Sequence, residues 1–175
     1  VLNEQVAECI SMLKKAKRPV LICGYGIRLS KGETEFSRLV EKLKIPVISS
    51  WTASDLIPTD NEHYIGRSGI MGDRAGNFTV QNSDLLLTIG TRMSIPQVGY
   101  NYSTFARKAK KIIVDIDEAE LRKPSIKPDL SVNADAKEFI VSMISRLEKE
   151  LITLHVGDWL QKCSNWKRKY PVALP

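Results

Sequence analysis

The sequence feature that most constrains the fold is an apolar segment near the N-terminus that runs directly into a glycine-rich turn. Pro19–Cys23 is apolar throughout and too short for a helix, and Gly24, Tyr25 and Gly26 follow it at once. A short apolar run bounded by proline and glycine is typical of a fully buried parallel strand. A strongly helical segment follows at about residues 30–43. The sequence therefore predicts a strand–turn–helix unit.

This unit allows two interpretations. Glycines let the backbone come close to a ligand and a helix N-terminus favours phosphate, so the turn could bind a nucleotide. Alternatively, Gly24 and Gly26 only make a tight connection in an α/β core. A dinucleotide fingerprint would have a third glycine where this chain has Leu29, and an acid where the next strand, Ile45–Ser50, ends in serines. We therefore do not expect an ordinary NAD site.

Length and composition are those of a globular domain. With 175 residues, of which 43% are hydrophobic and 26% charged, the chain can bury a substantial core. No apolar run approaches the roughly 20 residues that span a membrane, and residues 1–5 lack the features of a signal peptide. The first residue is not Met, which indicates a fragment of a longer protein.

The cysteines and the basic residues bear on compartment and partners. Cys9, Cys23 and Cys163 are far apart and lack metal-ligand spacing, so we expect reduced, buried thiols in a cytoplasmic protein and no metal site. The net charge of +6 comes from short basic groups near expected helix ends. No aromatic residues alternate with these groups, so we expect neither a nucleic-acid nor a membrane partner.

The first half of the chain alternates helices and strands around one long irregular segment. Residues 3–17 predict an amphipathic helix that Asn3 caps. Residues 51–67 have no periodicity and predict a long loop, which in a compact domain is usually functional or contacts a partner. The glycine pair of Ser68–Gly72 is either a turn or a second backbone patch near a ligand. A helix that ends near Asn82 follows.

Two later strands end in charged residues. Asp84–Gly90 is the clearest strand, and the nearby Arg92 is either a phosphate ligand at the carboxyl edge of the sheet or a surface arginine paired with a carboxylate. Lys111–Asp117 is a further strand that ends in acids. An acid there could accept hydrogen bonds from ribose hydroxyls or cap the next helical turn, and Asp117 suits the cap better than Asp115.

The last part of the chain predicts one more strand and two helices. Leu130–Asn133 is a short strand, and Asp135 begins a helix that continues to Leu147. A later helix carries an aromatic stripe that must pack on the domain or on a neighbour, made of Trp159, Cys163, Trp166 and Tyr170. Residues 171–175 resemble an extended linker.

Together these segments predict an α/β fold, with a doubly wound, Rossmann-like, mostly parallel sheet of about six strands flanked by helices. We divide the chain into a domain at residues 1–150 and a C-terminal helix and linker at residues 151–175. The sequence contains no recognisable catalytic constellation and no phosphate-binding Gly-x-x-x-x-Gly-Lys loop. By itself it predicts a ligand crevice without chemistry of its own.

An ordered series of segments resembles the central domain of thiamine-diphosphate-dependent enzymes, and most closely the large catalytic subunit of acetolactate synthase. The resemblance covers about residues 1–147 and is strongest over residues 81–117. The segments that carry it are Pro19–Gly26, Ile45–Val47, Gly69–Gly72, Gln81–Leu87, Gly90–Arg92 and Val114–Asp117.

The resemblance implies a parent enzyme of three domains that condenses or decarboxylates 2-keto acids such as pyruvate. Such a transferase or lyase, with a role in branched-chain amino acid biosynthesis, would bind thiamine diphosphate and magnesium in its other two domains. The chain has no Gly-Asp-Gly motif, so we expect it to be inactive alone. Its implied partners are the flanking domains of the same parent chain, within a homo-oligomer.

The resemblance also implies a structural FAD in this domain. Carried over residue by residue, the implied contacts are Gly24, Tyr25, Gly26, Ser50, Trp51, Gly69, Ile70, Met71, Gly72, Gly90, Thr91, Arg92, Asp115 and Ile116. After Arg92 the synthases usually continue with Phe, two Asp and Arg, whereas this chain has Met93–Pro96. FAD, another adenine nucleotide such as ADP, and an empty structural domain therefore stay open. A free-standing nucleotide-binding or regulatory module is the alternative to the enzyme fragment.

Overall fold

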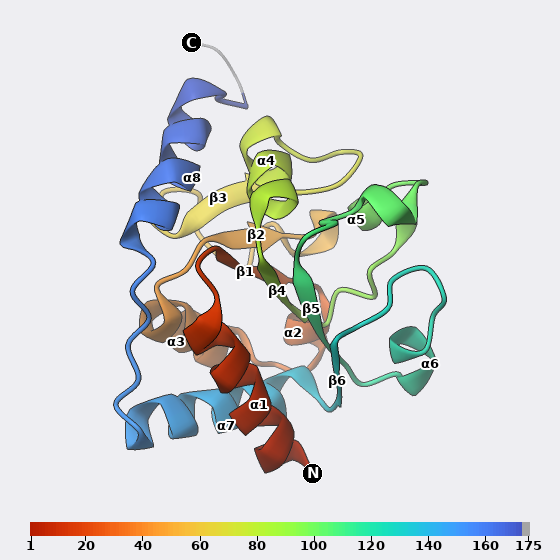
Figure 1. Cartoon of the computed structure of the whole chain (residues 1–175), viewed down its shortest axis with the longest axis vertical. Coiled ribbons are helices and arrows are strands. Elements are labelled where there is room, and N and C mark those ends of the chain that lie inside the picture. The colour runs from red at the N-terminus through yellow and green to blue at the C-terminus, as the bar shows by residue number, and fades with distance from the viewer. Residues whose placement is uncertain (173–175) are drawn as a thin grey trace.

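The computed structural model describes residues 1–172, in which six parallel strands form one sheet (Figure 1). The strands, in chain order, are β1 (Pro19–Cys23), β2 (Val47–Ser49), β3 (Tyr64–Arg67), β4 (Leu85–Ile89), β5 (Lys110–Asp115) and β6 (Leu130–Asn133). Their order across the sheet is β3-β2-β1-β4-β5-β6. The chain first builds outward from β1 and then restarts at β4 on its other side, so the topological switch point lies between β1 and β4. This order confirms the doubly wound, Rossmann-like prediction.

Helices cover both faces of the sheet. On one face α7 (Ala136–Lys149) packs against α1 (Leu2–Lys15) and α3 (Glu33–Leu43), and on the other α4 (Arg74–Asn82) packs against α8 (Gly157–Lys169), as Figure 1 shows. The connections contain the short helices α2 (Gly26–Leu29), η1 (Trp51–Ala53), α5 (Ile95–Val98), η2 (Tyr102–Thr104) and α6 (Glu118–Leu121). No helix within residues 1–172 is both long and apolar enough to cross a membrane.

The central strands are buried along their whole length because helices cover them on both faces. Every residue of β1, β2 and β4 is buried, and β1 pairs with β4 in register from Pro19–Leu85 to Cys23–Ile89. This is the burial that continuous apolar runs predict for a parallel sheet. In this register the glycine turn after β1 lies beside the turn after β4.

The helix expected after the glycine turn is interrupted. The chain makes one turn as α2, and Lys31 then adopts a left-handed φ of 56° while the Gly32 N–H donates to the Ile27 carbonyl at 2.9 Å. The longer α3 begins only at Glu33. The predicted continuous helix over residues 30–43 is thus wrong at its start, because a left-handed residue closes α2 and redirects the chain.

The predicted loop over residues 51–67 ends in a strand. β3 covers the last four residues and pairs with β2, with a register shift between Val47 and Ile48. Gly66 within β3 has a φ of 142°. Because β3 is short, contains this glycine and forms the edge of the sheet, its alternation is too weak to predict from the sequence.

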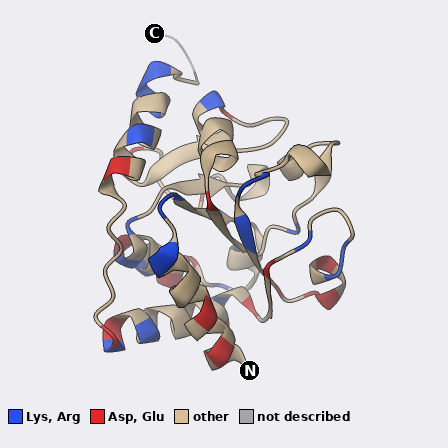
Figure 2. Ribbon diagram, viewed as in Figure 1, with Lys and Arg blue, Asp and Glu red and all other residues tan. Residues whose placement is uncertain are grey.

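The helix ends follow local sequence signals at Asp117 and Asp135 but not at Asn3. The Asp117 carboxylate accepts the Ala119 N–H and caps α6, and the Asp135 carboxylate caps α7 by accepting from Lys137 and Glu138. By contrast, α1 begins at Leu2 with Val1 as its N-cap, so Asn3 lies inside the helix rather than capping it. Helices α1 and α8 carry an acid in the first turn and cations in the last, which Figure 2 shows as red and blue ends.

The aromatic stripe packs back on the domain. In α8, Trp159 and Cys163 are buried, and the Trp159 indole N–H donates to the Pro19 carbonyl at 3.1 Å. Phe78 of α4 makes edge-on contacts with Trp166 and Tyr170, with ring centroids 5.9 and 5.5 Å apart. Helix α8 therefore shares the core of residues 1–150. Most of the predicted linker, residues 173–175, lies outside the described residues.

Candidate functional site

The carboxyl edge of the sheet is hollowed by two adjoining cavities, which together we call the crevice. The β5 cavity has a volume of about 610 Å³ and the β3 cavity about 410 Å³, and both are lined by Thr52, Thr91 and Ser94. The other residues of the β5 cavity are Tyr25, Gly26, Leu29, Ser30, Gly90, Arg92, Val114, Asp115, Ile116, Asp117, Asp135 and Ala136. Those of the β3 cavity are Ser50, Trp51, Arg67, Ser68, Met71, Pro96 and Gln97.

Most residues that the resemblance implied lie on this crevice. The structure brings together Tyr25, Gly26, Ser50, Trp51, Met71, Gly90, Thr91, Arg92, Asp115 and Ile116. Gly24, Gly69, Ile70 and Gly72 do not line either cavity. Ligand contact by any of these residues stays a prediction, but the geometry gives several of them other roles.

The switch-point glycines serve contact between two backbone turns. A Cβ on Gly24 would lie 2.1 Å from the Gly90 carbonyl oxygen, and one on Gly26 would lie 2.8 Å from the Gly90 Cα. The Gly24 N–H donates to the Ile89 carbonyl and the Gly26 N–H to the Gly90 carbonyl, at 2.9 and 3.0 Å. These two N–H groups are therefore occupied by the chain itself. The Gly24–Gly26 turn supports the tight-connection interpretation over a phosphate cradle.

Free backbone donors occur instead at the turn after β4. Gly90, Arg92 and Met93 have positive φ angles of 61°, 56° and 44°. Within residues 1–172, the backbone N–H groups of Thr91 and Arg92 have no protein acceptor. Turns in which left-handed residues expose successive N–H groups form concave anion sites, and such strained backbone is concentrated at functional sites. The Lys123 ammonium holds the Arg92 carbonyl at 2.6 Å.

The Arg92 side chain itself is 68% exposed and faces carboxylates. Its guanidinium lies 3.6 Å from Asp117 Oδ2 and 3.8 Å from Glu120 Oε1. The exposed pair between Arg92 and Asp117 contributes at most about 1 kcal/mol. Of the two interpretations of Arg92, the one that pairs it with a carboxylate describes this conformation.

The acids at the end of β5 have separate roles. Asp117 caps α6, whereas Asp115 is buried and its Oδ1 accepts the Asp117 N–H at 3.0 Å. The other carboxylate oxygen of Asp115 has no hydrogen-bond donor among the described residues. Because Asp115 lines the β5 cavity, this oxygen can accept a hydrogen bond from a ligand hydroxyl.

A fixed cation lies at the opposite end of the crevice. Arg67, at the end of β3, donates from Nη2 to Asp73 at 2.9 Å, and its guanidinium lies 5.2 Å from the centre of the Trp51 ring. The hydrogen bond that Arg67 donates to Asp73 raises the pKa of Arg67 and outweighs the opposing effect of burial. The guanidinium also supports Trp51, which stands half exposed at the mouth of the β3 cavity.

The loop over residues 68–72 is tied to its neighbours rather than open. The Asn77 side-chain amide accepts the Gly69 N–H at 2.9 Å and donates to the Gly69 carbonyl at 3.1 Å. The Ile70 N–H donates to the Pro96 carbonyl at 2.9 Å. Gly69 has a φ of 103°, and a Cβ there would lie 1.9 Å from the Pro96 oxygen. Gly69 is thus required for contact with the turn at Pro96.

Several lining residues were not among the implied ligand contacts, for example Arg67, Ser68, Ser94, Gln97 and Asp135. Arg67 and Ser68 would follow from recognising β3, because residues at the carboxyl ends of parallel strands meet at one edge. Asp135 could have been found from the sequence, because a helix cap that directly follows a strand also lies at the carboxyl edge of the sheet. No local pattern indicates Gln97.

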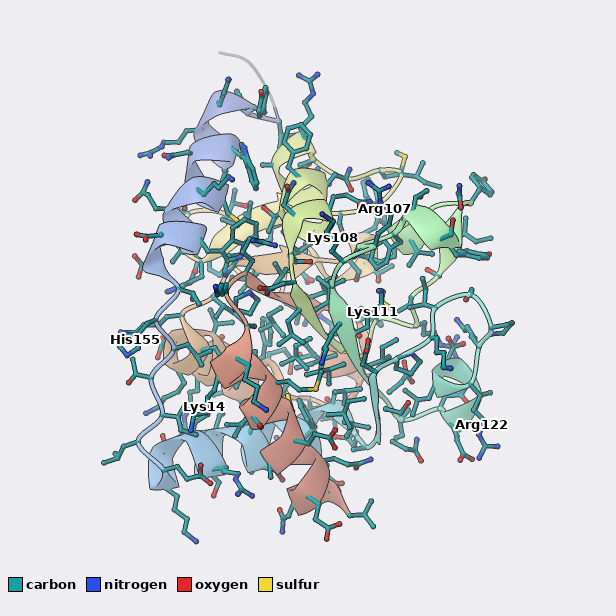
Figure 3. The ribbon with its side chains drawn as sticks, viewed as in Figure 1. Lys14, Arg107, Lys108, Lys111, Arg122 and His155 are labelled. Carbon is teal, nitrogen blue, oxygen red and sulfur yellow. The ribbon has the colours of Figure 1, made fainter. Side chains whose placement is uncertain are left out.

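The crevice takes its cations from Arg67 and Arg92, whereas the basic residues labelled in Figure 3 lie outside its lining. In Figure 3, Arg107 and Lys108 lie beside the start of β5 and Arg122 lies beyond α6. Lys111 of β5 donates from Nζ to the Ala106 and Ala109 carbonyls, at 3.2 and 2.9 Å. Its burial lowers its pKa. These cations cap local backbone or face solvent.

Within residues 1–172 the structure has no preformed metal centre. No group of three or more His, Cys, Asp or Glu side chains within residues 1–172 is arranged to hold a metal ion.

Comparison with known proteins agrees with the geometry. The sequence profile of the central domain of thiamine pyrophosphate enzymes matches residues 6–143. The acetolactate synthase large subunit of Cyanidium caldarium is 30% identical over 174 residues, which cover 98% of this chain and 29% of that protein. The probable acetolactate synthase large subunit of Methanocaldococcus jannaschii is 31% identical over 94% of this chain and 27% of its own length. The acetolactate synthase large subunit of Lactococcus lactis subsp. lactis is 31% identical over 97% of this chain and 28% of its own length. The chain thus spans less than a third of the length of these relatives.

Proposed function

The chain belongs to the family of thiamine pyrophosphate enzyme central domains, of the acetolactate synthase-like type, and on that premise we propose that it binds FAD in its crevice. The observation that carries the proposal is the continuity of the crevice along the carboxyl edge, with unoccupied backbone N–H groups at its middle. Six strands spaced about 4.8 Å apart make this edge roughly 24 Å long, which suits an extended dinucleotide.

The two cavities suit different parts of such a ligand. The β5 cavity offers the free Asp115 oxygen to ribose hydroxyls. The turn at Thr91 and Arg92 offers N–H groups to the pyrophosphate. The β3 cavity, walled by Trp51 and Met71, offers an apolar surface to a planar ring. The acids Asp115, Asp117 and Asp135 all line the β5 cavity, so charge repulsion disfavours phosphate at that end.

For the parent enzyme we propose a thiamine-diphosphate-dependent condensation or decarboxylation of 2-keto acids in the cytoplasm. Thiamine diphosphate supplies the stabilised carbanion in such reactions. We place the thiamine diphosphate and magnesium sites in other domains and expect this chain alone to be inactive. Three buried, unpaired cysteines support a reducing compartment.

The partners we propose are the flanking domains of the parent chain, within a homo-oligomer. Among the large apolar side chains that are more than half exposed, five lie on segments that follow strand ends, namely Leu29, Trp51, Ile70, Met71 and Ile116. Exposed apolar surface of this kind marks binding sites for proteins or ligands.

Titration of the chain with FAD and then with ADP tests the proposed site. We expect saturable quenching of flavin fluorescence and, at 100 times the dissociation constant, about 2.7 kcal/mol of added stability. Asp115→Asn should weaken both ligands about tenfold, since a hydrogen bond to a charged group contributes about 1.5–3 kcal/mol. Asp129→Asn is the matched control, because Asp129 accepts the Lys111 N–H beside the opposite edge of the sheet. Absence of binding by either ligand would refute the proposal.

A further inference from the structure

Gln97 places a buried amide in the wall of the β3 cavity. Its side chain belongs to a residue only 4% exposed, and Nε2 donates to the hydroxyl of Ser68, which is equally buried. Among the described residues Oε1 has no hydrogen-bond donor, yet it is not one of the atoms sealed from solvent. Gln97 is one of the residues that line the cavity.

Hydrogen bonds restrain the backbone on both sides of the contact between Gln97 and Ser68. The Gln97 N–H donates to the Ser94 carbonyl at 2.8 Å, and the neighbouring Pro96 carbonyl accepts the Ile70 N–H at 2.9 Å. Ser68 precedes Gly69, and the Asn77 side chain forms hydrogen bonds with both the N–H and the carbonyl of Gly69. The hydrogen bond between Gln97 and Ser68 therefore joins two restrained turns. The free Oε1 of Gln97 can then accept a hydrogen bond from a ligand with little further loss of side-chain entropy.

The cavity around the amide has apolar walls. Trp51, Met71 and Pro96 form its walls, and Arg67 lies 5.2 Å from the Trp51 ring centre. A planar heterocycle can stack against the indole while its edge meets the amide. An amide oxygen accepts and does not donate, so the matching group on the ring is an N–H.

We infer that Gln97, positioned by Ser68, is the specificity-determining residue of the crevice. Its Oε1 accepts a hydrogen bond from the imide N–H of a flavin ring that lies against Trp51, so the crevice discriminates in favour of FAD over ADP. The inference rests on the proposed function and assigns the flavin end of that ligand to the β3 cavity. ADP, which lacks the ring, leaves the Gln97 oxygen without its partner.

The test measures dissociation constants of FAD, of FAD methylated at the imide nitrogen, and of ADP. The proteins are the unmodified chain, Gln97→Leu, and the control Gln81→Leu, which makes the same change at an exposed position of α4. We expect Gln97→Leu to weaken FAD about tenfold and to leave ADP within about twofold. Methylation should weaken binding to the unmodified chain but add little in Gln97→Leu, because the two changes remove the same hydrogen bond.

The outcomes separate this inference from the proposed site. If Gln97→Leu alters FAD and ADP equally, or neither, or if methylation acts equally in both proteins, the role of Gln97 is refuted while the nucleotide site stands. If the unmodified chain binds ADP but not FAD, the flavin assignment fails. If it binds neither ligand, the proposed function fails and this inference fails with it.

Discussion

Replacing Gly24 with alanine is expected to destabilise the fold by about 3–5 kcal/mol through the contact between the two turns at the switch point. The added Cβ would lie 2.1 Å from the Gly90 oxygen, 2.5 Å from its carbonyl carbon and 2.5 Å from the Thr91 Cα. All three atoms belong to backbone, so no side-chain rotation relieves the overlap.

The magnitude follows from how far the turns must separate. Ordinary contact begins at 3.4 Å, so the Gly90 turn must move by more than 1 Å. Overpacking of this kind costs about 1–3 kcal/mol. The same movement stretches the hydrogen bonds from Gly24 to Ile89 and from Gly26 to Gly90, each worth about 1 kcal/mol.

Urea unfolding followed by tryptophan fluorescence measures the effect, with Gly157→Ala as the control. Gly157 begins α8, and a Cβ there meets nothing within 4 Å. We expect that substitution to change the free energy of unfolding by less than about 1 kcal/mol, and in the stabilising direction. If Gly24→Ala is as stable as the parent chain, the glycine is not required for backbone contact and the reasoning about the switch point is wrong.

Two further predictions concern other parts of the molecule. Burial lowers the pKa of His63, so between that folded value and the unfolded value of about 6.5 the unfolded state binds more protons. The free energy of unfolding therefore decreases as the pH is lowered through this range. Urea unfolding between about pH 7.5 and 5.5 should show a smaller decline for His63→Gln, and equal declines would contradict this. Trp159→Ala should cost about 3–5 kcal/mol by removing a buried side chain and its bond to Pro19. A loss below about 1 kcal/mol would mean that α8 does not share the core.

Local sequence signals predicted the elements whose determinants are contiguous in the chain. The apolar runs of β1 and β4 can only be accommodated as strands buried on both faces. The caps of α6 and α7 depend on Asp117 and Asp135 alone, because a cap bonds N–H groups two or three residues away. β3 was not predictable, since its pairing with β2 stabilises it more than its own four residues do.

The sequence by itself therefore determined the fold class, the family and the set of strand ends from which a site could be built. Only the tertiary structure decided which strands are neighbours, because one apolar run looks like another in the sequence. Their order across the sheet depends on how the helices pack and on where the connections between strands cross. That order brings Gly24 and Gly26 against Gly90 and moves the free N–H groups to Thr91 and Arg92. It also places Gln97 opposite Ser68, a contact between residues 29 positions apart that no periodicity encodes.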